Sequence, residues 1–178
     1  LFIIQTGFYS MLSWQQTLNG VTVAGLGNQA LLSLPMPAFF ASRQCPGIAI
    51  RAALDWALKQ ARSKTPVISG FHSPLEQSVL KILLEAQSPA VIMLARPVEN
   101  SRLPPDWKAA ISAGNLAVIG PSTKTERITE ESASERNDTV AFLAEKIVIA
   151  HVDPNGMLAK QVAHWQMKNL NIQNLLTP

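Results

Sequence analysis

The sequence predicts an α/β fold: a three-layer, Rossmann-like open sheet that is mostly parallel, with helices on both faces. Short apolar runs alternate five times with longer segments that repeat apolar residues at helical spacing. The run PAVIMLA at 89–95 contains no polar residue, which is typical of a strand covered on both faces. Hydrophobic residues make up 47% of the 178 residues and charged residues 15%, a balance that excludes a disordered chain.

Prolines and glycines mark most boundaries between these elements. Pro46 and Pro74 stand at predicted helix starts, and Gly114 follows a predicted helix end. Since parallel strands need a long crossover connection, the alternation indicates a parallel sheet. The predicted strands are 38–41, 66–69, 89–95, 116–119 and 146–151. The predicted helices are 47–63, 74–86, 106–113, 131–144 and 157–167.

A chain of this length predicts one principal domain. We expect a Rossmann-like domain at 36–168, an N-terminal extension at 1–35 and a C-terminal tail at 169–178 that is a surface appendage. Within the extension, we expect a loose helix at 5–18 and a short helix at 28–32. The polar stretch 121–131 predicts a lid or binding loop.

The chemistry-bearing residues favour a cytoplasmic protein without a cofactor. A single cysteine, Cys45, excludes an internal disulfide framework and a cysteine-rich metal site. His72, His151 and His164 show no metal-ligand spacing, so we expect no metal. The apolar start of the chain is too short to span a bilayer, and no membrane partner is expected. We expect a homo-oligomer.

The charge is unevenly distributed along the chain. Up to Pro74 there are five cationic residues and one acid, Asp55, which gives +4, whereas the remainder carries −1. This asymmetry indicates an anionic partner near the first half of the sheet, although a solvated helix face would explain most of it.

The ends of the predicted strands carry small, hydroxyl and cationic residues. Ligands of open α/β sheets bind outside the carboxyl ends of the strands. Ser42 and Arg43 follow the first strand, Ser69 and Gly70 end the second, and Arg96 follows the third. Small residues allow close approach to a phosphate and arginines can donate to it in pairs. Each arginine alone could equally be a solvated or salt-bridged loop residue.

A glycine pattern near the N-terminus allows two interpretations. Gly25-x-Gly27-x-x-Ala30 resembles a dinucleotide fingerprint, which requires a solid strand before it and an acid about 20 residues later. Here the strand would be short and the nearest acid, Asp55, lies in a predicted helix. A glycine-rich turn that caps the short helix at 28–32 is the favoured interpretation.

Five segments resemble, in their order and spacing, the DNA-processing protein family DprA/Smf. The resemblance covers residues 18–164. It rests on GNQALL at 27–32 followed by PAFFASR at 37–43, VISG at 67–70, AVIMLAR at 90–96 with LPP at 103–105, Arg136-Asn137, and Asn155-Gly156. Ala41 stands where the family has glycine and Asp138 where it has a second arginine, which indicates a reduced or divergent member.

The resemblance implies a groove for nucleotide or single-stranded DNA phosphates, no catalytic residues, and a role in DNA processing or uptake. We therefore expect a non-catalytic binding protein of the Rossmann-like nucleotide-binding group. The residues expected to bind the ligand are Ser42, Arg43, Gly47, Ser69, Gly70, His72, Arg96, Arg136, Asn137, Asn155 and Gly156.

Two other functions stay open at this point. Phosphoribohydrolases of the same wider group cleave nucleoside monophosphates, and Glu76 with His72 nearby could act as a general base here. An acid in the first turn of a helix also stabilises the helix dipole without any catalytic role. The third interpretation is a scaffold whose helices mediate self-association.

Overall fold

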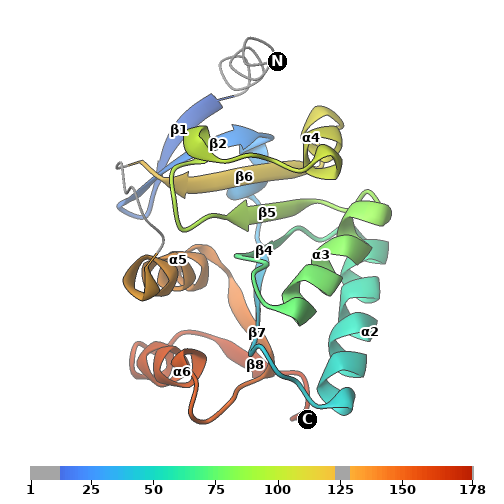
Figure 1. The fold of residues 1–178 in the computed structure, drawn as a ribbon, viewed down its shortest axis with the longest axis vertical. Helices are drawn as coiled ribbons and strands as arrows, with labels where there is room; N and C mark the ends of the chain where they lie inside the picture. The colour runs from blue at the N-terminus through green and yellow to red at the C-terminus, as the bar shows by residue number, and fades with distance from the viewer. Residues whose placement is uncertain (1–12, 123–128, 178) are drawn as a thin grey trace.

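Eight strands form one mixed sheet with helices on both faces in the computed structural model, which describes residues 13–122 and 129–177 (Figure 1). Five of the seven neighbouring strand pairs are parallel, which confirms the predicted fold class. The strands are β1 (Ser13–Leu18), β2 (Val21–Gly27), β3 (Pro37–Ala41), β4 (Val67–Ser69), β5 (Ala90–Met93), β6 (Leu116–Pro121), β7 (Lys146–His151) and β8 (Ile172–Asn174). The helices are α2 (Gly47–Ser63), α3 (Pro74–Glu85), α4 (Pro105–Ser112), α5 (Glu130–Leu143) and α6 (Met157–Met167), with short 3₁₀ helices η1 (Gln29–Ser33) and η2 (Val98–Asn100).

The strand order is β1-β2-β6-β5-β4-β3-β7-β8. From β3 the chain first adds β4, β5 and β6 on one side, and then adds β7 and β8 on the other. The order therefore reverses between β3 and β7. In open α/β sheets the crevice for a ligand lies at the carboxyl ends of the strands at this switch point.

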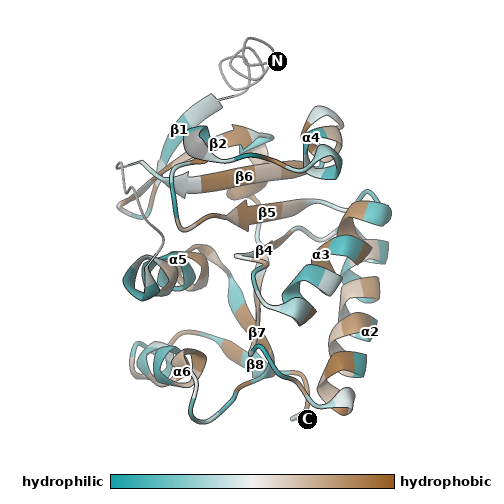
Figure 2. Cartoon of the chain, in the orientation of Figure 1, coloured by the Kyte–Doolittle hydropathy of each residue, from teal (hydrophilic) through white to brown (hydrophobic). Residues whose placement is uncertain are grey.

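Two apolar layers pack against the two faces of the sheet. Phe39 and Phe40 are neighbours in β3 and point to opposite faces, as strand geometry requires. Phe39 stacks on Trp56 of α2 with ring centroids 5.1 Å apart, and Phe40 packs against Trp165 of α6 at 4.8 Å. Figure 2 shows β5 and β6 as mainly hydrophobic and α5 and α6 as largely hydrophilic on the side in view. Trp56 is therefore a packing residue, as its place in a helix predicts.

The N-terminal segment forms a hairpin. β1 and β2 pair antiparallel, and β2 also pairs with β6, so both belong to the sheet. Asn19 (φ 49°) and Gly20 (φ 84°) form the two-residue turn, a combination of positive φ values that suits Asn-Gly hairpins. The predicted helix at 5–18 is therefore wrong over 13–18, and its remainder lies outside the described residues.

The glycines of the dinucleotide-like pattern serve strand packing. Gly25 lies within β2, where a Cβ would collide with the ring of Trp14. Gly27 has φ 89°, and the Trp14 indole donates to its carbonyl at 2.9 Å. Asn28 then caps the 3₁₀ helix η1 by accepting from the Ala30 N–H. This confirms the favoured interpretation of a turn that caps a short helix.

The regular part of the chain matches its prediction closely. The bounds of α2, β7 and α6 are those predicted. The tail differs, because residues 172–174 form β8 and pair with β7, so this part is no surface appendage. The division at residues 36 and 168 stays a prediction, and the predicted loop at 121–131 lies largely outside the described residues. No helix in the described ranges is long and apolar enough to cross a membrane.

Candidate functional site

The loops that follow β3 and β7 are tied together by Ser42. Its N–H donates to the His151 carbonyl at 3.0 Å, and its hydroxyl oxygen accepts from the Asp153 N–H at 2.8 Å. Ser42 is almost fully buried. Its hydroxyl proton remains a possible donor to a ligand, since a hydroxyl both donates and accepts. Ser42 therefore has a structural role, because it holds the loops after β3 and β7 together, in addition to lying at the switch point.

Glu76 ties the loop after β4 to the end of β3. Its Oε1 accepts from the Ala41 N–H at 3.1 Å, and its Oε2 accepts from the N–H groups of His72 at 2.8 Å and Ser73 at 3.1 Å. The Ser73 hydroxyl accepts from the Glu76 N–H in return, which completes a capping box at the start of α3.

The environment of Glu76 is that of a structural carboxylate. Burial raises its pKa, while the backbone hydrogen bonds from Ser73, Ala41 and His72 and the charge of Arg136 act in the opposite direction. Only 6% of its surface is exposed. A general base needs a free lone pair within reach of substrate. The geometry gives both oxygens of Glu76 backbone partners instead.

Arg136 reaches from α5 across the carboxyl end of β4. Its guanidinium lies over Gly70, where a Cβ would come within 2.7 Å of Nε. The Arg136 Nε and Nη2 donate to the Asn137 Oδ1 at 3.1 and 3.0 Å. Burial lowers the pKa of Arg136 and the neighbouring Glu76 raises it, and the guanidinium remains charged. Gly70 therefore allows the close approach by having no side chain.

Asn137 connects Arg136 to α6 through a buried polar chain. Its Nδ2 donates to the Gln161 Oε1 at 2.9 Å. Gln161 in turn donates to the carbonyl and hydroxyl of Ser134. Asp138 accepts from the Trp165 indole at 2.7 Å, so this departure from the family pattern joins α5 to α6. The Asn137 side chain thus holds Arg136 in place.

A groove of about 680 Å³ opens at the switch point. We call it the switch-point groove. The titratable side chains that line it are the cationic or basic Arg43, His72 and Arg136 and the acidic Glu76, Glu130 and Asp153. The pKa of His72 is lowered by partial burial and then by the charges of Arg136 and Arg43. Two guanidinium groups therefore act on one small volume together with three carboxylates, of which Glu76 already accepts from three backbone N–H groups.

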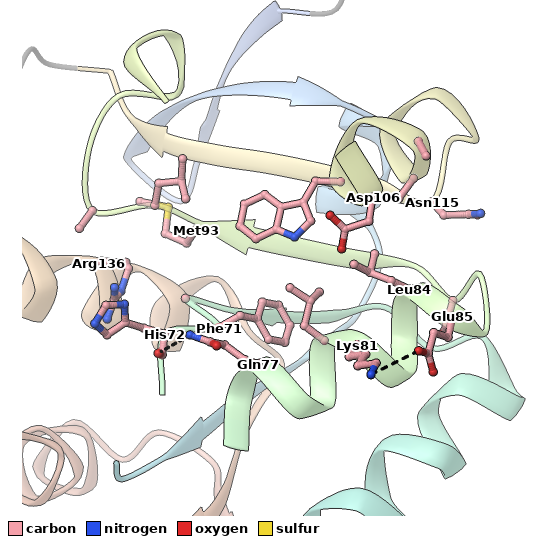
Figure 3. Close-up of a pocket in the computed structure, with 18 of the residues that line it drawn as sticks. Phe71, His72, Gln77, Lys81, Leu84, Glu85, Met93, Asp106, Asn115 and Arg136 are labelled. Atoms are coloured by element: carbon pink, nitrogen blue, oxygen red, sulfur yellow. Dashed lines mark hydrogen bonds and ion pairs between the residues drawn. The ribbon is translucent and has the colours of Figure 1, made fainter. Parts of the chain in front are cut away.

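A second groove of about 870 Å³ lies between α3 and α4; we call it the helix groove. Figure 3 shows His72 and Arg136 at one end of it, Glu85, Asp106 and Asn115 at the other, and Phe71 between. Its lining surface is mainly apolar, and the apolar residues that form it are Phe71, Leu80, Leu84, Met93, Leu94, Trp107 and five alanines. His72, Ala133 and Arg136 line both grooves, so the two meet at these residues.

The structure brings most of the predicted site residues to these two grooves. The switch-point groove is lined by Ser42, Arg43, His72, Arg136, Asn137 and Gly156, and the helix groove by Gly70, His72, Arg96 and Arg136. Neither groove is lined by Gly47, Ser69 or Asn155.

These three residues have other surroundings. Ser69 is fully buried and its hydroxyl accepts from the Phe71 N–H at 3.1 Å. Gly47 opens α2 with empty space where a Cβ would lie. Asn155 is exposed and its N–H donates to the Asp153 carboxylate at 3.0 Å. Ligand contact by any of them stays a prediction.

Phe71 and Trp107 line the helix groove, although no pattern in the sequence indicates it. Phe71 has a positive φ of 47°, a backbone state rare for an aromatic residue, and its side chain is almost fully buried. Trp107 is half-buried on α4. A tryptophan in an amphipathic helix predicts a packing residue. Trp107 lines a groove because α4 lies beside α3 and leaves a groove between the two helices.

The described residues contain no group of three or more His, Cys, Asp or Glu side chains placed to hold a metal ion. Cys45 donates from its thiol to the Ser42 carbonyl at 3.2 Å. Burial, followed by the charge of Glu76, raises the pKa of the thiol. This cysteine therefore has the environment of an inert structural thiol.

A comparison with solved structures finds the same architecture elsewhere. The DNA processing protein A (DprA) of Helicobacter pylori superposes with a TM-score of 0.74 at 13% identity, over 91% of this chain and 79% of that one. The chain has a DprA-like fold. The structure of the H. pylori protein is described as giving insight into how that protein binds single-stranded DNA. The fold implied by the sequence resemblance is therefore confirmed.

Other matches agree with a DprA-like fold. DprA of Streptococcus pneumoniae has a TM-score of 0.70 at 14% identity, and this chain spans about half (54%) of that structure's length and 86% of its own. The molybdenum cofactor carrier protein of Chlamydomonas reinhardtii has a TM-score of 0.52 at 14% identity, over 79% of this chain and 75% of that one. No family model and no curated protein matches the sequence.

Proposed function

We propose that this chain binds single-stranded DNA, or a nucleotide, through its phosphates at the carboxyl edge of the sheet. The observation that carries the proposal is the convergence of Arg43, His72 and Arg136 on the switch-point groove. Clustered guanidinium groups suit phosphate because their N–H donors match its oxygens. The ligand described for the H. pylori protein supports the choice of single-stranded DNA.

The arginines are available for this role. Arg43 is exposed and has no hydrogen-bond or ion-pair partner among the described residues. Arg136 uses Nε and Nη2 for Asn137, which leaves Nη1 for a ligand. The buried acid Glu76 accepts from three backbone N–H groups, and the charge that acts on it is that of Arg136 rather than Arg43. Phosphate would therefore bind without first displacing an ion pair of Arg43.

The alternative of a nucleoside-monophosphate hydrolase has weaker support. It would require Glu76 as the general base, and the backbone partners of both its oxygens favour a structural role. Incubation with a panel of nucleoside monophosphates is expected to release no free base. If the wild type releases free base and the Glu76→Gln variant does not, the hydrolase is favoured instead.

Fluorescence anisotropy with a labelled oligothymidylate at low salt tests the binding proposal. Arg43→Ala is expected to weaken binding about tenfold, since a hydrogen bond to a charged group contributes about 1.5–3 kcal/mol. Arg51→Ala is the matched control, because Arg51 pairs weakly with Asp55 on the exposed face of α2 and lines neither groove. Absence of binding, or an equal loss in both variants, would contradict the proposal.

Three further properties are proposals of the same kind. A role in DNA processing or uptake follows from the resemblance, and the single cysteine supports a cytoplasmic location. Self-association as a homo-oligomer is supported by large exposed apolar side chains on α2, among them Ile48 (68% exposed) and Leu58 (42%). Size-exclusion chromatography with light scattering tests the oligomer directly, and a monomer at all concentrations would exclude it.

A further inference from the structure

The helix groove has properties that phosphate binding at the switch-point groove does not use. It is the larger of the two and is mainly apolar. Its arginines, Arg96 and Arg136, lie at the carboxyl edge, where the two grooves meet at His72, Ala133 and Arg136. A ligand that fits it therefore needs an anionic group at one end and an apolar body that extends away along α3 and α4.

We propose that the helix groove is a base-binding subsite, which takes one heterocyclic base of a strand whose adjacent phosphate is bound by Arg136. The inference rests on the proposed function and names where a base of that ligand binds. A nucleotide has the required polarity, because its charge is confined to the phosphate and its base has flat apolar faces. Continuity of the groove with the phosphate site is the reason to prefer a base over an unrelated apolar ligand.

Trp107 gives the groove a surface for stacking, and the almost fully buried Phe71 forms part of the apolar lining beside it. The turn after β4 holds Phe71 in the left-handed region, and the Ser69 hydroxyl accepts from its N–H. Trp107 projects from the first turn of α4 and is half-buried. Bases stack on such rings irrespective of sequence, and each stacked base strengthens binding by a factor of about five to a hundred.

Polar groups beyond the rings match the edge of a base. Asp106 and Asn115 line the end of the groove that is far from Arg136 (Figure 3). Ser88 also lines it, is fully buried, and its hydroxyl has no hydrogen-bond partner among the described residues. Buried polar side chains normally have partners. The donors and acceptors on the edge of a base could supply them, whereas an acyl chain or an aliphatic peptide side chain could not.

The charges along the groove favour the same orientation. Lys81 is engaged with Glu85 at 3.8 Å on α3, so the far end of the groove has no net excess of positive charge from this pair. Arg96 donates through Nε to the Ser101 hydroxyl at 3.1 Å and retains its other N–H groups. The phosphate is therefore attracted to the carboxyl edge, and the base is placed along the apolar lining.

Binding of two matched ligands separates the base from the phosphates. One is a labelled oligothymidylate and the other an abasic strand of the same length and charge. The wild-type protein is expected to bind the thymidylate about tenfold more tightly. Trp107→Ala is expected to bring this ratio close to one and leave the affinity for the abasic strand unchanged, while Trp107→Phe retains the ratio.

A second variant guards against a loss of packing in Trp107→Ala. Ala109 is exposed on α4 and lines the groove, so Ala109→Met fills the groove without removing any side chain. It should lower the ratio in the same way and keep the melting temperature. A ratio of one in the wild type, or an unchanged ratio in both Trp107→Ala and Ala109→Met, would overturn the base subsite alone. Failure of the wild type to bind either strand would overturn the proposed function and the subsite together.

Discussion

The guanidinium of Arg136 lies over Gly70, although Arg136 belongs to helix α5 and Gly70 to the loop after strand β4. A Cβ at residue 70 would lie 2.7 Å from the Arg136 Nε and 2.9 Å from its Cζ. The absence of one side chain therefore lets a cation from one helix layer reach the junction of two grooves.

Gly70→Ala is expected to weaken oligonucleotide binding about tenfold by displacing Arg136, in line with the loss of one charged hydrogen bond. Its free energy of unfolding should change by less than about 1 kcal/mol, because only the end of a flexible side chain has to move. Arg51→Ala is the control, since Arg51 lies on the exposed face of α2 and lines neither groove. Equal affinities of the two variants would contradict the role of Gly70.

Asn137→Ala tests whether the polar chain positions Arg136. The Asn137 Oδ1 accepts two hydrogen bonds from Arg136, so its loss should free the guanidinium and weaken binding severalfold. The Arg136→Ala/Asn137→Ala double variant should then bind no more weakly than Arg136→Ala alone. Additive losses would show that Asn137 contacts the ligand or acts independently of Arg136. Circular dichroism and thermal unfolding control for the lost contact with Gln161.

Glu76→Gln is expected to lower the free energy of unfolding by about 1–3 kcal/mol, the cost of leaving a buried backbone N–H without an acceptor. An amide at this position would direct an NH₂ group at the N–H of Ala41 or at those of His72 and Ser73. Urea denaturation measures the change. Glu85→Gln, which breaks only the exposed pair with Lys81, should stay within about 0.5 kcal/mol of the wild type. A Glu76→Gln protein as stable as that control would contradict the structural role.

The affinity for phosphate should rise as the pH falls. Partial burial, followed by the charges of Arg136 and Arg43, lowers the pKa of His72 from its ordinary value of 6.5 in the free protein, and a bound phosphate counteracts the two charges and raises it. Binding is then coupled to uptake of a proton by His72, so the affinity increases as the pH falls through the range in which His72 titrates, by at most about tenfold per pH unit. His72→Gln should abolish this dependence. Anisotropy titrations between about pH 5.5 and pH 8 measure it, and an unchanged slope in His72→Gln would exclude His72 as the group responsible.

Periodicity and turn residues predicted most of the fold, and failed where they are ambiguous. Trp14 and Leu18 are four residues apart, a spacing that suits one face of a helix and also one face of a strand. The Asn19-Gly20 pair that follows is a strong hairpin signal and would have decided the matter. β8 has only three residues, too few for any period to be recognised.

Strand order predicted part of the candidate site. Residues at strand ends share one edge of a parallel sheet, which is why Ser42, Arg43 and Gly70 lie at the grooves. Arg136 lies on α5, and only the family resemblance indicated it. The individual contacts depend on packing between distant segments. No local pattern states that Glu76 accepts from Ala41, 35 residues earlier, or that α3 and α4 leave a groove between them.

The most direct test of the central claim is the dependence of the oligonucleotide affinity on salt concentration. Each phosphate contact on a single strand contributes about −0.7 to the slope of log K against log salt. Arg43→Ala/Arg136→Ala is therefore expected to reduce the slope of the wild type by about 1.4, whereas the control Arg51→Ala/Arg62→Ala, on α2, leaves it unchanged. The same slope in the wild type and in Arg43→Ala/Arg136→Ala would show that these arginines bind no phosphate.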